Sequence, residues 1–115
     1  MREGTELTTF ITAIRDDHRI GTSHISLYLA LFHFYNLNQF QNPVVITRAA
    51  VMKVAKISGL ATYHKCMRDL VEMGYVEYKP SFNPAVNSQV LLLKLELSIN
   101  HDKENFEEFG RIDDV

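Results

Sequence analysis

The sequence predicts a mainly helical α+β domain, and three observations lead to this fold class. Apolar residues recur at helical spacing in four successive segments, at 6–18, 24–38, 48–57 and 60–73. Two strand-like runs follow at 75–79 and 89–97, separated by a loop rich in Pro and Asn. The 115 residues are 46% apolar and include seven Phe and five Tyr, which is enough to fill one core. We therefore expect one domain over residues 1–95, followed by a tail over 96–115.

The first expected helix, at 6–18, is amphipathic. Its apolar side chains fall on one face, at Leu7, Phe10, Ile11 and Ile14. Thr5 is a candidate N-cap, and the segment RIGTS at 19–23 ends the helix.

The second expected helix has a different character. Ser23 is a candidate N-cap, and the helix runs to about Asn38. Only a thin polar stripe interrupts its apolar surface, at Ser26, His33 and Asn36. A helix with so little polar surface is either central in the core or covered by a partner chain, and the sequence leaves both open.

The middle of the chain predicts a strand and two short helices joined by a tight turn. VVIT at 44–47 is a β-branched run that fits an edge strand. Thr47 is a good N-cap for the helix at 48–57, and Ser58 and Gly59 form the turn. The fourth helix runs from about Leu60 to Met73, and Gly74 takes its C′ position.

The expected strands form a β-hairpin. YVEYK at 75–79 alternates with period two, and QVLLLKLEL at 89–97 is apolar enough to be covered on both faces. The connection PSFNPAVNS at 80–88 makes a long tip. In the tail, helical spacing of Phe106, Phe109 and Ile112 allows either a short docked helix or a frayed end.

Charge is distributed unevenly along the chain. Residues 44–95 carry seven basic and three acidic side chains, whereas residues 96–115 carry two basic and seven acidic ones. The overall charge of −2 therefore hides a basic middle and an acidic tail. That tail either repels nucleic acid, docks on the basic region as an autoinhibitor, or is simply solvated.

The segment TYHKCMR at 62–68 brings reactive side chains together in sequence but not in space. Residues two apart on a helix point to nearly opposite sides, so His64 and Cys66 cannot form a catalytic or metal-binding pair. One side is a packing face, made of Tyr63, Cys66, Met67, Leu70 and Val71. The opposite side carries Ala61, His64, Lys65, Arg68 and Glu72, with Thr62 at its edge.

The order of charges on this helix runs against its dipole. Lys65 precedes Asp69 by four residues and Arg68 precedes Glu72 by four, so the cations lie nearer the N-terminus. Each end-placed charge of the wrong sign costs about 0.3–1 kcal/mol. Stability alone would not select this order, whereas phosphates against the N-terminal half would. A solvated charged face is the alternative.

Helix, tight turn, helix and hairpin follow one another in the order of a winged helix-turn-helix. The stretch VAKISGLATYHKCMRDLVEMGYVEY at 54–78 resembles the bacterial winged-helix pattern, including its ending L-x-x-x-G-Y-V. With ITR at 46–48 and GYVEYKPSFNP at 74–84, the chain is similar to small winged-helix proteins of Bacteroides-type bacteria that are often carried on mobile elements. The resemblance covers about residues 25–95.

The resemblance implies sequence-specific binding of double-stranded DNA by a transcriptional regulator, with the helix at about 60–73 in the major groove. It makes Thr62, His64, Lys65 and Arg68 the groove-facing candidates. The expected phosphate contacts come from the preceding helix and the base of the wing, at Arg48, Lys53, Lys56 and Lys79. It also predicts a homodimer through the apolar helix 24–38, which would present two recognition helices to two half-sites.

A second function class remains open, namely a winged helix that serves as a protein-interaction or replication-organising module. Two features favour this second class: the wing tip at 81–88 contains no Lys or Arg, and the tail is acidic.

An enzyme is not expected, because the chain has no Gly-rich phosphate loop, no G-x-S-x-G and no H-E-x-x-H. Its five His are scattered and it has one Cys, so no metal or other cofactor is expected. The longest apolar stretch, at 25–37, is shorter than the roughly 20 residues of a membrane helix. The first ten residues lack the apolar core of a signal peptide, so we expect a cytoplasmic protein.

Overall fold

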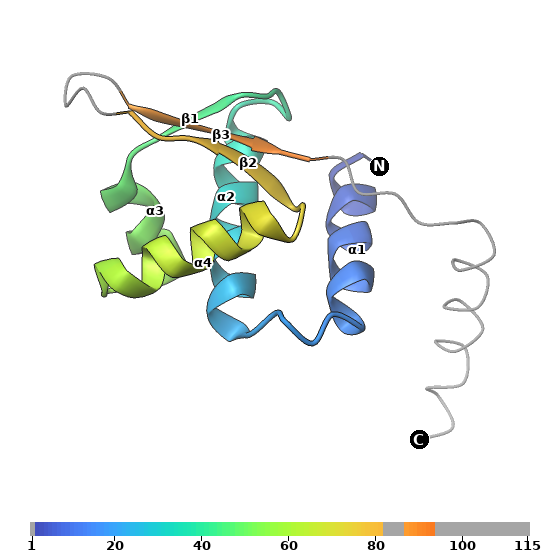
Figure 1. Ribbon diagram of the computed structural model, residues 1–115. Helices are drawn as coiled ribbons and strands as arrows, with labels where there is room; N and C mark the ends of the chain where they lie inside the picture. The colour runs from blue at the N-terminus through green and yellow to red at the C-terminus, as the bar shows by residue number, and fades with distance from the viewer. Residues whose placement is uncertain (1, 82–86, 94–115) are drawn as a thin grey trace, which may run out of the picture.

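The computed structural model describes residues 2–81 and 87–93, which form a small, mainly helical α+β domain. Helices and strands follow in the order α1 (Arg2–Arg15), α2 (Thr22–Leu37), β1 (Val44–Ile46), α3 (Arg48–Ala55), α4 (Leu60–Glu72), β2 (Val76–Lys79) and β3 (Ser88–Leu92) (Figure 1). The coarse fold class predicted from the sequence is therefore confirmed. The acidic tail at 96–115 and most of the hairpin tip lie outside the described residues.

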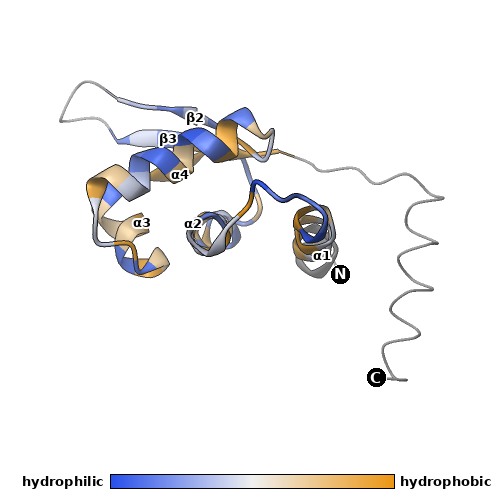
Figure 2. Ribbon diagram, turned by 60° about the horizontal axis from the view of Figure 1, so that its bottom comes forward, coloured by the Kyte–Doolittle hydropathy of each residue, from blue (hydrophilic) through white to orange (hydrophobic). Residues whose placement is uncertain are grey.

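α2 is the central helix of the domain. It packs against α3, α4, β1 and β3, and Leu27 and Leu31 are fully buried on it. Seen with α2 nearly end-on, α3 and α1 flank it on either side and α4 crosses over it (Figure 2). Burial in the core therefore accounts for most of the apolar surface that the sequence left open to a core or a partner.

The three strands form one antiparallel sheet in the order β1-β3-β2. β3 is the central strand, and its buried Val90 pairs with Val44 on one side and Tyr78 on the other. The predicted hairpin between β2 and β3 and the predicted edge strand β1 are both confirmed. β3 ends at Leu92, so the part of the expected strand beyond Leu93 lies outside the described residues.

Two predicted N-caps are wrong. Thr5 lies inside α1, which begins at Arg2 and ends at Arg15, before the predicted end at residue 18. α2 begins after Gly21 rather than Ser23. The His24 side chain takes the capping role, because its Nδ1 accepts the backbone N–H of Gly21 at 2.9 Å. A histidine in the third helical position is not among the residues that usually signal an N-terminus, so the sequence pattern missed it.

The predicted ends of α3 and α4 agree better with the structure than the predicted N-caps of α1 and α2 do. The Thr47 Oγ1 accepts the backbone N–H of Ala50 at 3.2 Å, which confirms it as the N-cap of α3. α3 stops at Ala55, two residues before the predicted end at residue 57, since Lys56 takes a left-handed conformation with φ of 62°. Gly74, with φ of 85°, follows α4 where the sequence placed a C′ glycine.

Aromatic stacking joins α1 to the rest of the domain. The fully buried ring of Phe10 stacks on Tyr28 of α2, with ring centroids 3.7 Å apart, and meets the edge of Tyr75 at 5.5 Å. The Tyr75 hydroxyl in turn donates to the Asp17 carboxylate, 3.0 Å away in the α1–α2 connection. Asp17 also accepts two hydrogen bonds from the Arg19 guanidinium, which lower the pKa of its carboxyl. α1 is therefore part of the domain core.

Replacement of Phe10 by Ala tests this conclusion. It is expected to lower the free energy of unfolding by about 3–5 kcal/mol, because it empties a fully buried aromatic site. Its neighbour Ile11 is exposed on the same helix, so Ile11→Ala is expected to cost less than about 1 kcal/mol. Chemical denaturation followed by circular dichroism measures both. Equal losses for the two variants would show that α1 does not dock through Phe10.

Candidate nucleic-acid interface

α4 divides into a buried and an exposed face. The buried residues are Tyr63, Cys66, Met67 and Leu70, and the exposed residues include Thr62, His64, Lys65 and Arg68. Figure 2 shows the hydrophilic and hydrophobic positions alternating along the helix. The predicted division is confirmed, with one error: Val71, assigned to the packing face, is 38% exposed. The four residues expected to face a groove are all accessible.

The buried side explains why the His–Lys–Cys sequence is not a reactive site. Cys66 is buried, and burial raises the pKa of its thiol. His64 is exposed on the other side of the helix, so the two side chains do not meet. Within residues 2–81 and 87–93, no group of three or more His, Cys, Asp or Glu could hold a metal ion. No described helix is long and apolar enough to cross a membrane.

A hydrogen-bond chain holds α4 against the start of α2. The Nδ1 of His24 accepts the Gly21 N–H, so its Nε2 carries the proton and donates to the Asp69 carboxylate at 2.8 Å. Lys65 donates to the same Asp69 oxygen at 3.0 Å. These bonds lower the pKa of Asp69, the one from His24 contributing most. Asp69 therefore has a structural partner in His24. This explains why an acidic residue occupies the C-terminal half of α4, where the helix dipole disfavours negative charge.

The Lys65–Asp69 contact is weak enough to leave the Lys65 ammonium available for another anionic partner. It is an exposed pair four residues apart on one helix, and such pairs contribute only about 0.3–0.5 kcal/mol. A phosphate or a guanine edge could replace Asp69 as the partner of Lys65 at little cost. Asp69 would keep its bond to His24, which is largely shielded from solvent.

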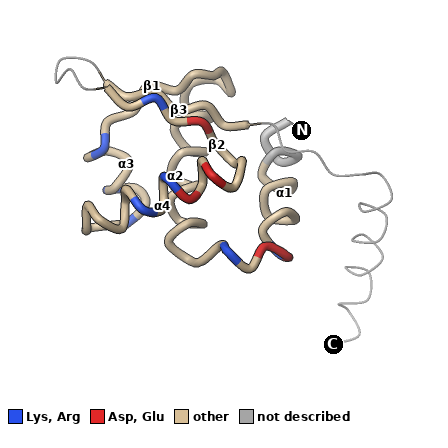
Figure 3. The backbone as a smooth tube through the Cα atoms, viewed as in Figure 1, with Lys and Arg blue, Asp and Glu red and all other residues tan. Residues whose placement is uncertain are grey.

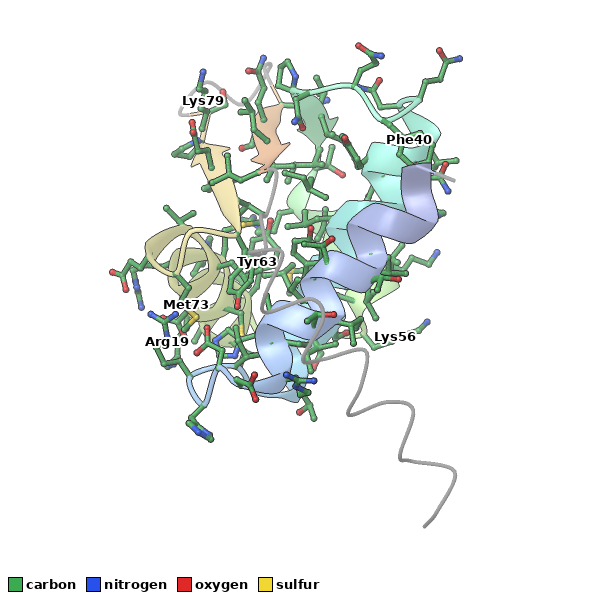
Figure 4. The ribbon with its side chains drawn as sticks, turned by 90° about the vertical axis from the view of Figure 1, so that its right-hand side faces the viewer. Arg19, Phe40, Lys56, Tyr63, Met73 and Lys79 are labelled. Atoms are coloured by element: carbon green, nitrogen blue, oxygen red, sulfur yellow. The ribbon has the colours of Figure 1, made fainter. Side chains whose placement is uncertain are left out.

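Tyr63 is the first buried residue of α4 and one of the largest fully buried side chains of the described domain. Tyr63 lies in the interior between α4 and the sheet (Figure 4), and its hydroxyl has no hydrogen-bond partner among the described residues. Burial raises the pKa of this hydroxyl to about 12, and Arg48 and Tyr78 are near enough to influence it. Arg48 itself is exposed and is the first residue of α3.

The other predicted cations separate into two groups. Lys53 and Lys56 are exposed on α3 and at its end, and Lys79 is exposed at the end of β2. In Figure 4, Lys79 is on the same side as α4, whereas Lys56 points away on the opposite side. Figure 3 shows most of the basic segments over α3, α4 and the end of β2, and the acidic ones on α4, on β2 and near the end of α1. The structure does not bring Lys56 to the exposed face of α4.

Sequence reasoning missed two features of this surface. The His24–Asp69 bond links positions 45 residues apart, and no local pattern indicates such a pair. Leu60, the first residue of α4, is 50% exposed, although it is one of the large apolar residues. Leu60 lies three residues before Tyr63, in register with the packing face, so periodicity gave no signal of its exposure.

Comparisons with known proteins identify no relative of this chain: no protein-family model matches it, and no curated protein or solved structure matches it significantly.

The role of Asp69 can be tested through the pH dependence of stability. The folded state lowers the pKa of Asp69, so its contribution is present above about pH 4 and is lost as the pH falls through the folded-state pKa. Asp69→Asn is therefore expected to lower the free energy of unfolding at pH 7, with a difference from the native chain that shrinks below pH 4. Urea titrations between pH 2.5 and 7 measure this difference.

Glu72→Gln is the matched control, because Glu72 is exposed on α4 and the described structure gives it no ion pair. It should change stability little at any pH. A constant difference for Asp69→Asn across the whole range would contradict the assigned role of the carboxylate.

Proposed function

We propose that this chain is a winged helix-turn-helix protein that binds double-stranded DNA in a sequence-specific way and acts as a transcriptional regulator. In this proposal α2, α3 and α4 form the three-helix core, and α1 is an additional N-terminal helix. The β2–β3 hairpin is the wing, and α4 is the recognition helix in the major groove.

One observation carries the proposal. α4 buries its apolar face against the core and exposes Thr62 and Lys65 in its N-terminal half and Arg68 about one turn further on, directly after a turn from α3. N-terminal residues of a recognition helix are those that contact base edges. Arg68 and Lys65 supply donors that suit guanine O6 and N7, and Thr62 suits a thymine methyl or a phosphate.

Cations around α4 support phosphate contacts on the same side. Lys79 at the end of β2 lies on the same side as α4, and Arg48 is exposed at the start of α3, so both would contact backbone phosphates. Lys53 on α3 is exposed and remains a candidate. Lys56 is left out of the interface, since it points away from α4.

The test is the salt dependence of DNA binding. A protein that neutralises Z phosphates loses affinity with a slope of about −0.9Z in a plot of log K against log salt. The double variant Lys65→Gln with Arg68→Gln is expected to weaken binding on the order of a hundredfold, because each lost base or phosphate contact costs about 1–3 kcal/mol. Fluorescence anisotropy with a duplex selected from a random pool gives both quantities.

Lys56→Gln is the matched control, since it removes the same charge from an exposed position away from α4. Its affinity should stay within about threefold of the native chain, a change of roughly 0.6 kcal/mol. Absence of binding to any duplex at 50 mM salt would end the DNA-binding proposal. An equal effect of Lys56→Gln would show that binding follows net charge and does not use α4.

We also propose that the protein is a homodimer through the outer face of α2 (residues 24–38 in the sequence analysis). The core occupies most of this helix, but Leu29, His33, Asn36 and Leu37 remain exposed on one side. Leu37 is 68% exposed and Leu29 41%. Two-fold pairing there would present two copies of α4 to DNA half-sites separated by about one helical turn.

Sedimentation equilibrium at micromolar concentration tests the dimer. The native chain is expected to sediment as a dimer, and Leu29→Lys with Leu37→Lys is expected to yield monomers because charges would replace the apolar contact. A native monomer at these concentrations would remove the dimer and leave the proposed DNA contacts of α4 unchanged.

The alternative is a winged helix that acts as a protein-interaction or replication-organising module. It is favoured by the lack of Lys and Arg at residues 81–88 and by the acidic residues 96–115. Binding that does not depend on duplex DNA and changes little with salt would support it.

A further inference from the structure

Leu60 differs from the other large apolar residues at the start of α4. It is the first helical residue and is 50% exposed, whereas Tyr63, one turn later, is fully buried. Packing inside the described domain therefore leaves half of the Leu60 side chain in contact with water. Its neighbours Gly59 and Ala61 are also exposed and have almost no side-chain bulk. Leu60 is therefore accessible on the surface of the domain.

Leu60 lies at the border between the buried and the exposed face of α4, because it is three residues before the buried Tyr63 and four before the exposed His64. Leu60, His64 and Arg68 follow one another at intervals of four residues, so they lie on one side of α4. All three are exposed. This row of three residues thus begins with an apolar group and ends with a cation.

An apolar group and cations together restrict which kind of surface the exposed side of α4 can contact. Lys65 shares Asp69 with His24, so an anionic surface suits both Lys65 and Arg68. Leu60 requires an apolar group within the same anionic surface. The major groove of DNA offers both, because phosphates line it and the C5-methyl group of thymine is an apolar group on its base edges.

We propose that Leu60 contacts a thymine methyl group and thereby contributes to the sequence preference of α4. This inference rests on the proposed DNA binding and adds to it a specificity-determining residue outside the polar set. It predicts that bound sequences share at least one thymine under the first turn of α4. Replacing that thymine by deoxyuridine removes the methyl group alone and leaves every hydrogen-bonding atom in place.

The experiment compares thymine and deoxyuridine in duplexes selected by the native protein. Each thymine is replaced singly, and the dissociation constant is measured for the native chain and for Leu60→Ala. For the native chain, loss of the contacted methyl group is expected to weaken binding about fourfold, as for one buried CH₂ group. Leu60→Ala is expected to bind the thymine and deoxyuridine duplexes equally at that position.

Ile11→Ala is the matched control, because it removes the same number of apolar atoms from an exposed residue of α1, away from α4 and from the proposed dimer face. It should keep the full fourfold sensitivity to the methyl group. Circular dichroism checks that Leu60→Ala is folded, and alanine is a favourable helix residue at this position.

Two results would overturn the inference while DNA binding stands. One is a native chain that tolerates deoxyuridine at every position, and the other is a methyl sensitivity that Leu60→Ala retains. Failure to bind any duplex would remove the inference together with the proposed function.

Discussion

Burial of one face of α4 against α2 is the constraint on which the rest of the structure depends. Leu70 on α4 and Leu27 and Leu31 on α2 are completely buried, and Tyr63 and Met67 are almost so. Interiors are close-packed, so a rotation of α4 would leave cavities or force clashes across this contact. The opposite face of α4 is therefore held toward solvent by packing and not by its own charges. The position of every exposed cation on this helix follows from apolar contacts on its other side.

Polar bonds then refine an orientation that packing has set. The His24–Asp69 bond ties the side of α4 to the first turn of α2, and the same imidazole caps α2 through the Gly21 N–H. One side chain thus satisfies an otherwise unpaired helix donor and fixes an anion beside Lys65. A second bond, from Tyr75 to Asp17, ties the segment after α4 to the connection between α1 and α2. Both bonds act near the C-terminal end of α4, so the N-terminal half of the chain holds that end of the helix in place.

The sequence predicts the faces of α4 because burial there follows the helical period, and Tyr63, Cys66, Met67 and Leu70 all obey it. It predicts Thr47 and Gly74 because their roles depend on local backbone chemistry. It fails at Thr5, because α1 already begins at Arg2, and at Ser23, because His24 caps α2 at Gly21 and also has a distant partner. It fails at Lys56 for another reason: the left-handed conformation after α3 redirects the chain, and periodicity carries no information about such a turn. The correct predictions depend on the helical period or on local backbone chemistry, whereas the missed cap of α2 belongs to a side chain whose other partner is 45 residues away.

The number of cations beside α4 has a consequence for how the protein would recognise DNA. The cations predicted to contact DNA that remain once Lys56 is set aside are Arg48, Lys53, Lys65, Arg68 and Lys79, and residues 81–88 add none. Counterion release from a few phosphates gives weak, salt-sensitive binding by a single copy. Selectivity would then come from contacts of α4 with base edges, where each matched contact contributes about 1–3 kcal/mol. A second copy would double those contacts without adding a strongly cationic surface, which suits a protein whose overall charge is −2.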